Sequence, residues 1–134
     1  MKQFKALWLA SAFLVVCIAT TLSAQQHTKD SLETVKKSLA EKKAVLLDVR
    51  EQAEWDGGHL LDAKLLPLSI INAKDKSPEY AKGLPKDQVI YLHCAAGKRC
   101  VTAAAVLQKL GYDARPLKEG YKDLLKAGFK QADQ

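Results

Sequence analysis

The sequence predicts an α/β domain with a mostly parallel central sheet and helices on both faces. Two runs, 44–49 and 89–93, are almost wholly apolar, which is typical of parallel strands that are buried on both faces. Segments whose apolar residues recur at helical spacing alternate with these runs along the chain. The 134 residues are enough for one domain and not comfortably for two.

The first half of the predicted domain holds two helical segments and two strands. Residues 31–42 present an apolar face at helical spacing, with Asp30 or Ser31 as the cap. The elements that follow are a buried strand over 44–49, a helical turn over 51–55 that Gly57 and Gly58 end, and a short strand over 64–66 that Pro67 stops.

The second half begins with a polar connection over 69–85 that contains a short helix. The later elements are the strand over 89–93, a helix over 100–110 closed by Gly111, a third buried strand over 114–117 and a last helix over 121–127 closed by Gly128. Parallel sheets bind ligands at the carboxyl ends of their strands, and Cys94 directly follows such an end.

Residues 1–24 are predicted to be a signal peptide that precedes a mature domain over 25–134. A short positive segment, 1–5, comes before an uncharged and mostly apolar stretch over 6–22, and Ala24 offers a small residue before the cut. An uncleaved membrane anchor is the alternative, although the stretch is short for a membrane span. We expect export to the periplasm, which is an oxidising compartment, and no stable membrane association after cleavage.

The charge of the chain argues against a nucleic-acid partner. The formal net charge of +6 loses two positive charges when Lys2 and Lys5 leave with the signal peptide. The remaining basic residues are scattered and aromatic residues are few, which is not the pattern of a nucleic-acid-binding surface. The cysteines and histidines lack the spacing of metal ligands, so the sequence predicts no metal site and no cofactor.

Two cysteines, Cys94 and Cys100, remain in the mature chain, because Cys17 lies in the signal peptide. Two cysteines in an exported protein are often a structural disulfide. The position of Cys94, in a short turn between a strand and a helix, favours a catalytic thiolate instead, since backbone N–H groups and the helix N-terminus stabilise negative charge there. Lys98 and Arg99 add positive charge beside it, which indicates a cysteine nucleophile that acts on a small anionic substrate.

The spacing within this turn distinguishes two kinds of cysteine loop. Four residues separate Cys94 from Arg99, whereas protein tyrosine phosphatases, which share the His-Cys pair, have five. A shorter ring of N–H groups suits a single sulfur atom carried on the cysteine as a persulfide anion. Gly97 permits a positive φ within the ring.

Three stretches of the chain resemble the rhodanese family of sulfurtransferases, over nearly the whole predicted domain. They are 47–51 with Glu54-Trp55, Gly58-His59-Leu60, Ala63 and Pro67-Leu68, then the loop over 94–99, and last Leu110-Gly111-Tyr112 with Leu117 and Glu119-Gly120. Together with the export signal, they are similar to the small periplasmic type of the family, represented by phage-shock protein E.

The resemblance implies a persulfide cycle. The Cys94 thiolate would attack the outer sulfur of thiosulfate, sulfite would leave, and an acceptor such as cyanide or a thiol would take the sulfur. The residues expected to bind the sulfur donor or the bound sulfur are Ala95, Ala96, Gly97, Lys98, Arg99 and Cys100. The chain departs from the family where many members have arginine after the cysteine, at Ala95, and at Tyr121 and Leu125.

Other polar residues are predicted to be structural. Asp48 is expected to cap backbone N–H groups at a strand end, and Arg50 to pair with a nearby acid. His59 is expected to be hydrogen-bonded in a turn, and His93 to be packed in the interior. Two further functions stay open. One is a thiol redox protein in which Cys100 resolves an oxidised Cys94, and the other is a non-enzymatic module that carries sulfur or binds anions. Packing at the start of the helix is the simpler role for Cys100.

Overall fold

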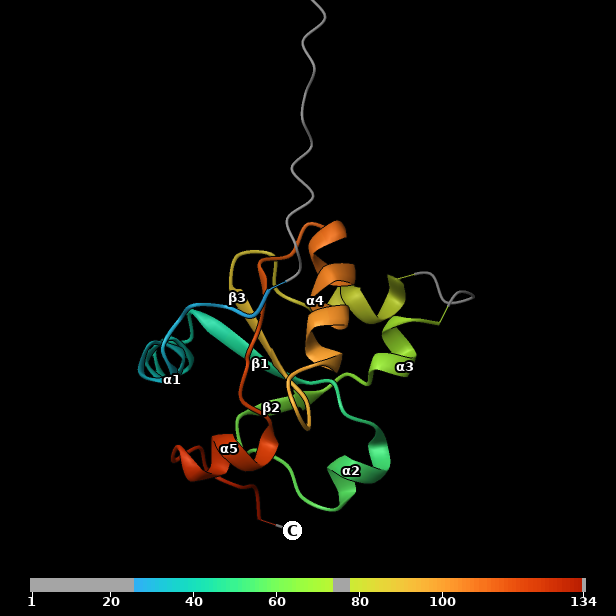
Figure 1. Ribbon diagram of the computed structural model, residues 1–134. Helices are drawn as coiled ribbons and strands as arrows, with labels where there is room; N and C mark the ends of the chain where they lie inside the picture. Colours follow the sequence, from blue (N-terminus) through green and yellow to red (C-terminus); the bar gives the residue numbers. More distant parts are fainter. Residues whose placement is uncertain (1–25, 74–77, 134) are drawn as a thin grey trace, which may run out of the picture.

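The computed structural model describes residues 26–73 and 78–133 (Figure 1). The predicted signal peptide over 1–24, Cys17 and the expected cut lie outside the described residues, so these predictions stay untested.

The centre of the domain is a four-stranded sheet in which every neighbouring pair of strands is parallel. The spatial order is β2-β1-β3-β4. The strands are β1 (Ala44–Asp48), β2 (Ala63–Leu65), β3 (Val89–His93) and β4 (Ala114–Pro116). The predicted fold class is therefore confirmed.

Helices cover both faces of the sheet, as Figure 1 shows. One face packs against α1 (Leu32–Ala40) and α5 (Tyr121–Lys126), and the other against α3 (Leu68–Ile71), the 3₁₀ helix η1 (Pro78–Gly83) and α4 (Arg99–Lys109). The two central strands serve both layers because successive side chains alternate between the faces. Leu46 belongs to the core under α1 and α5, and its neighbour Leu47 to the core under α4.

The predicted helices and strands outside 69–85 lie within two residues of their expected bounds, and the small differences have physical causes. The first helix ends at Ala40 rather than at residue 42, because Lys42 adopts a left-handed conformation with φ of 55° that turns the chain into β1. The helical turn α2 (Gln52–Asp56) begins after Glu51, which is its N-cap. The connection over 69–85 holds two short helices, α3 and η1, where one was expected.

The register of the sheet places the candidate site. Asp48 at the end of β1 pairs with His93 at the end of β3, and the Val49 N–H donates to the His93 carbonyl at 3.0 Å. The two strands therefore end level with each other. The segment that follows β1 and the loop that begins at Cys94 leave the sheet side by side, at the edge where a parallel sheet binds its ligands.

Candidate active site

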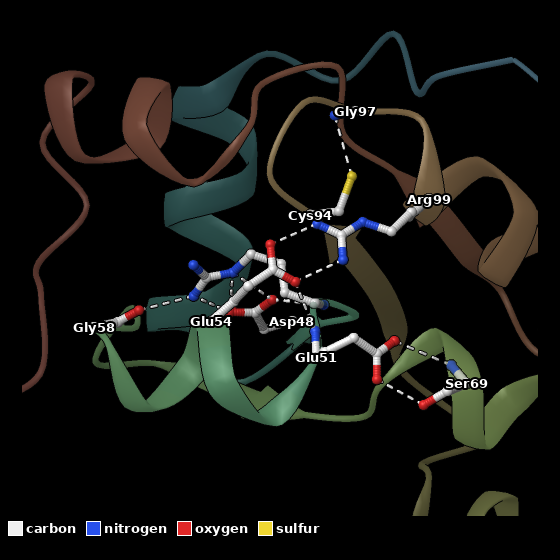
Figure 2. Close-up of polar contacts among 9 residues, drawn as sticks. Asp48, Glu51, Glu54, Gly58, Ser69, Cys94, Gly97 and Arg99 are labelled. Atoms are coloured by element: carbon white, nitrogen blue, oxygen red, sulfur yellow. Dashed lines mark hydrogen bonds and ion pairs between the residues drawn. The ribbon is translucent and has the colours of Figure 1, made fainter.

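The loop over 94–98 joins β3 to α4 and surrounds the sulfur of Cys94. The Gly97 N–H donates to Cys94 Sγ at 3.1 Å (Figure 2). Gly97 reaches this position with φ of 79°, in the left-handed region that favours glycine. The predicted positive φ at Gly97 is confirmed. Cys94 is only 1% exposed, whereas Ala95 and Ala96 are exposed at the surface of the loop.

The surroundings of Cys94 favour the thiolate. They lower the pKa of its thiol to about 5, first through a hydrogen bond from the Cys100 thiol and then through the backbone N–H groups of Cys100, Ala96 and Gly97. Burial opposes the shift, because it disfavours the charged form. The hydrogen bonds outweigh the effect of burial, so Cys94 is ionised at neutral pH. The thiolate is the form of cysteine that reacts as a nucleophile.

Cys100, unlike Cys94, is a protonated thiol. Its hydrogen bond to Cys94 and its burial raise the pKa of its own thiol, so it keeps its proton. Its Sγ also lies 3.3 Å from the carbonyl oxygens of Gly97 and Leu117, and a thiol can donate its one proton to only one acceptor at a time. Both cysteines are free in this structure. The location of Cys100, fully buried at the start of α4, agrees with the packing role that the sequence suggested.

Arg99 directly follows the loop, at the start of α4, and its guanidinium forms an ion pair with Glu54. Its Nη1 donates to Glu54 Oε2 at 2.6 Å and its Nη2 to Glu54 Oε1 at 2.7 Å (Figure 2). The hydrogen bonds from Arg99 lower the pKa of the Glu54 carboxyl to about 2. Lys98 is exposed and makes no ion pair with any described residue. The prediction that Lys98 and Arg99 bind the sulfur donor stays untested. In this structure the Arg99 guanidinium is already paired with a carboxylate.

Glu54 is a site residue whose ion pair the sequence reasoning missed. It belongs to α2, where its Oε2 accepts the Glu51 N–H at 3.0 Å in a capping box. Glu51 in turn accepts the Ser69 hydroxyl at 2.6 Å. Glu54 stands three residues after the N-cap, where the carboxylate of a capping box belongs, but nothing in the sequence indicates that the same carboxylate reaches Arg99, 45 residues away.

A buried ion pair between Asp48 and Arg50 lies beside the site. Asp48 accepts the Arg50 backbone N–H at 3.0 Å and three hydrogen bonds from the Arg50 guanidinium, which also donates to the Gly58 carbonyl at 2.9 Å. The guanidinium carbon lies 4.1 Å from the centre of the Tyr121 ring. The structural roles predicted for Asp48 and Arg50 are confirmed.

The two histidines near the site are also structural, as predicted. His59 stacks on the Trp55 ring at 3.7 Å between centroids, and its Nδ1 lies 3.1 Å from the Trp55 carbonyl. His93 is fully buried, and burial lowers the pKa of its imidazole, so it is neutral. Its Nε2 lies 3.6 Å from Asp48 Oδ2.

The segment over 117–121 closes the other side of the loop. The Tyr121 N–H donates to the Cys94 carbonyl at 2.9 Å. A Cβ on Gly120 would lie 1.9 Å from the Ala95 carbonyl oxygen, a distance at which atoms overlap. The Glu119-Gly120 pair therefore has a steric reason, since only glycine lets the two backbones meet.

The described ranges, 26–73 and 78–133, hold neither a metal-binding cluster nor a membrane-spanning helix. No three His, Cys, Asp or Glu side chains there are grouped so that they could hold a metal ion. No helix in these ranges combines the length and the apolar character that a membrane span requires.

A parallel α/β domain with an ionised cysteine in a ring of backbone N–H groups, at the carboxyl end of a central strand, defines a protein built for cysteine nucleophilic chemistry. The comparisons with known proteins give the family. The model of the rhodanese-like domain matches residues 31–127, and the chain belongs to this family.

Three similar proteins illustrate the range of this family. Residues of the chain are 40% identical over 80 positions to the probable adenylyltransferase/sulfurtransferase MoeZ of Mycobacterium tuberculosis, covering 59% of this chain and 19% of MoeZ. YqhL of Bacillus subtilis is 32% identical over 123 positions, which cover 91% of this chain and 92% of YqhL. The human single-domain sulfurtransferase TSTD1 superposes with a TM-score of 0.62 at 30% identity, over 72% of this chain and 94% of TSTD1.

The chain thus spans about a fifth of MoeZ and nearly all of TSTD1. Several of the proteins that this chain resembles, TSTD1 among them, are named sulfurtransferases.

Proposed function

We propose that the protein moves a sulfane sulfur from thiosulfate, or from a persulfide, to a thiophilic acceptor such as cyanide or a thiol, through a persulfide on Cys94. The observation that carries this proposal is the contact between the Gly97 N–H and the sulfur of Cys94, in a loop that holds the thiol ionised. A ring that stabilises negative charge on one sulfur atom also suits the terminal sulfur of a persulfide anion.

In the first half of the cycle, the Cys94 thiolate attacks the outer sulfur of thiosulfate. A new S–S bond forms to Cys94, the S–S bond of thiosulfate breaks, and sulfite leaves with the electron pair of that bond. In the second half, cyanide or a thiolate attacks the terminal sulfur, and the Cys94 thiolate leaves. The low pKa of Cys94 serves both halves, because it supplies the nucleophile and then makes a good leaving group.

The donor anion would bind where the loop meets α4. Ala95 and Ala96 present only small apolar side chains there, so Lys98 and Arg99 are the positive side chains that the loop itself contributes. Arg99 would turn from Glu54 toward the bound anion, or share its N–H groups between the two. Glu54 therefore sets how strongly Arg99 attracts a donor.

The protein would act in the periplasm as the mature chain 25–134, in the manner of the phage-shock protein E type. The support is the positive segment, the apolar stretch and Ala24 near the N-terminus. N-terminal sequencing of the protein from a periplasmic fraction should begin near Gln25. Recovery of an intact Met1 in the membrane fraction would replace this proposal with a retained anchor.

The decisive test of the function is the mass of the purified protein after thiosulfate treatment, followed by turnover with cyanide. A gain of one sulfur atom on Cys94, with thiocyanate formed in repeated turnovers, supports the enzyme. Cys94→Ser should lose both while it stays folded, because serine cannot form a persulfide. A loss of two hydrogens without a gain of sulfur would indicate the redox pair of Cys94 and Cys100, and a gain of sulfur without turnover would indicate a carrier module.

A further inference from the structure

The chain segment that precedes α1 lies against the Cys94 loop. His27 Nε2 is 2.6 Å from the carbonyl oxygen of Gly97, 70 residues further along the chain. A carbonyl oxygen only accepts hydrogen bonds, so Nε2 carries the hydrogen and donates it. Neither the predicted sulfur chemistry nor the family motifs of the sequence use this histidine.

The segment around His27 is fixed to the sheet at two further points. The Thr28 N–H donates to the Pro116 carbonyl at 2.8 Å. Asp30 Oδ2 accepts the Tyr91 hydroxyl and an N–H of Arg115, each at 2.8 Å. Figure 1 shows this segment in blue as it passes toward α1. Because β3 and β4 hold the residues that follow it, His27 meets the loop from a fixed position.

Gly97 is the residue on which the contacts of the loop converge. Its N–H donates to Cys94 Sγ at 3.1 Å, and its carbonyl accepts from His27 and lies 3.3 Å from Cys100 Sγ. On another side, the Lys118 carbonyl lies so close that a Cβ on Gly97 would be 2.5 Å from its oxygen. The Gly97 N–H and the Gly97 carbonyl belong to neighbouring peptide groups that share the Gly97 Cα. The bond from His27 fixes the carbonyl and so restricts how far this Cα, and the N–H with it, can move from the sulfur.

We propose that His27 is a positioning residue of this site: it holds the Gly97 carbonyl so that the Gly97 N–H stays on the sulfur of Cys94. The proposal rests on the proposed function of Cys94 as the sulfur carrier. A cut after Ala24 would leave His27 in the mature chain, as this role requires.

The test compares His27→Ala, His27→Asn and His27→Gln with a matched control, Gln88→Ala. The Gln88 side chain also donates to a backbone carbonyl, that of Lys42 at 2.8 Å, but at the opposite end of the sheet. The measurement is the rate at which iodoacetamide alkylates Cys94 as a function of pH, with the modified residue identified by mass spectrometry. This rate reports the thiolate of Cys94 and does not require sulfur transfer.

We expect His27→Ala to shift the midpoint of Cys94 alkylation upward by about 0.5–1 pH unit, which is the effect of about one hydrogen bond on the thiolate. His27→Asn should behave like alanine, because its amide is too short to reach. His27→Gln should restore the midpoint, since its amide places an N–H donor near the position of Nε2. In cyanide turnover below the midpoint, His27→Ala should lose about threefold to tenfold in kcat/KM.

An unchanged midpoint in both His27→Ala and His27→Asn would overturn the proposal, and so would an equal shift in Gln88→Ala, which would indicate general loosening. Circular dichroism identifies a variant that fails to fold, and the other substitutions at His27 then decide. If His27→Ala shifts the midpoint of Cys94 alkylation as expected but the wild-type protein never gains sulfur, the proposed function is wrong. The effect of His27 on the Cys94 thiolate then still stands.

Discussion

The ion pair between Arg99 and Glu54 allows a sharp test of how the site binds its donor. A donor anion that binds Arg99 competes with a carboxylate that accepts two bonds of 2.6 and 2.7 Å. If Arg99 is the donor ligand, Glu54→Gln should improve the use of thiosulfate, because the guanidinium is no longer matched by a charge. If Arg99 only braces the loop against α2, the same substitution should impair it.

The magnitude follows from the exposure of the pair. The Arg99 and Glu54 side chains are 33% and 37% exposed, so water and salt screen their attraction, which we place at about 0.2–1 kcal/mol. Glu54→Gln should therefore raise kcat/KM for thiosulfate by up to about fivefold. Arg99→Ala removes a hydrogen bond to a charged group, about 1.5–3 kcal/mol, and should lower kcat/KM by about 10- to 150-fold.

The assay is the steady-state formation of thiocyanate from thiosulfate and cyanide at low ionic strength. Glu41→Gln is the matched control, since it removes a carboxylate that pairs with Lys43 at 2.6 Å, just before the amino end of β1. Its kcat/KM should equal that of the wild type. A fall in Glu54→Gln as large as that in Arg99→Ala would refute the donor-binding role, and normal kinetics in Arg99→Ala would do the same.

Three further predictions concern neighbouring groups. Lys98→Ala should reduce kcat/KM for thiosulfate less than Arg99→Ala, and the difference from wild type should vanish in high salt, because an exposed charge is screened; a salt-independent defect would contradict this. Cys100→Ser should keep turnover, since a hydroxyl can still donate to Cys94; loss of activity with an intact fold by circular dichroism would indicate a two-cysteine mechanism. Burial lowers the pKa of His93 below its ordinary value of 6.5, so below pH 6.5 the unfolded chain takes up a proton that the folded chain does not. The measurement is urea unfolding of Cys94→Ser, a variant without the thiolate, whose own titration would lower the stability in the same direction. The free energy of unfolding should fall as the pH drops from 6.5, with His93 contributing at most about 1.4 kcal/mol per pH unit. A flat profile would mean that His93 is protonated in the folded state.

The sequence was sufficient to predict the parts of the fold whose pattern is strong. The runs that became β1 and β3 are long and apolar, and Gly111 and Gly128 mark helix ends with φ of 86° and 88°. The short elements between β2 and β3 were predicted less well, because helices of four to six residues have too few positions to show a period.

The site was predictable where the chemistry is local and was not where it depends on tertiary contacts. Cys94, Gly97 and the start of α4 are consecutive in the chain, so their motif describes their geometry. The partners of this loop come from far away: Glu54 reaches it from α2, and His27 from the segment before α1. A polar residue that acts at such a distance has no neighbour in the sequence to mark it, and only the folded chain brings it to the loop.

The division of labour in this loop indicates which of its residues can change. Apart from the Cys100 thiol, the donors that face the sulfur are backbone N–H groups, which are the same for any side chain, so Ala95 and Ala96 can vary at the exposed surface of the loop while these donors stay in place. Gly97 and Gly120 cannot, since a Cβ would meet a carbonyl oxygen at 2.5 Å and 1.9 Å. The stabilisation of negative charge on the sulfur therefore depends on the backbone geometry of the loop together with the Cys100 thiol. Under the proposed function, the choice of sulfur donor would depend on the side chains beside the loop, where Glu54 forms an ion pair with Arg99.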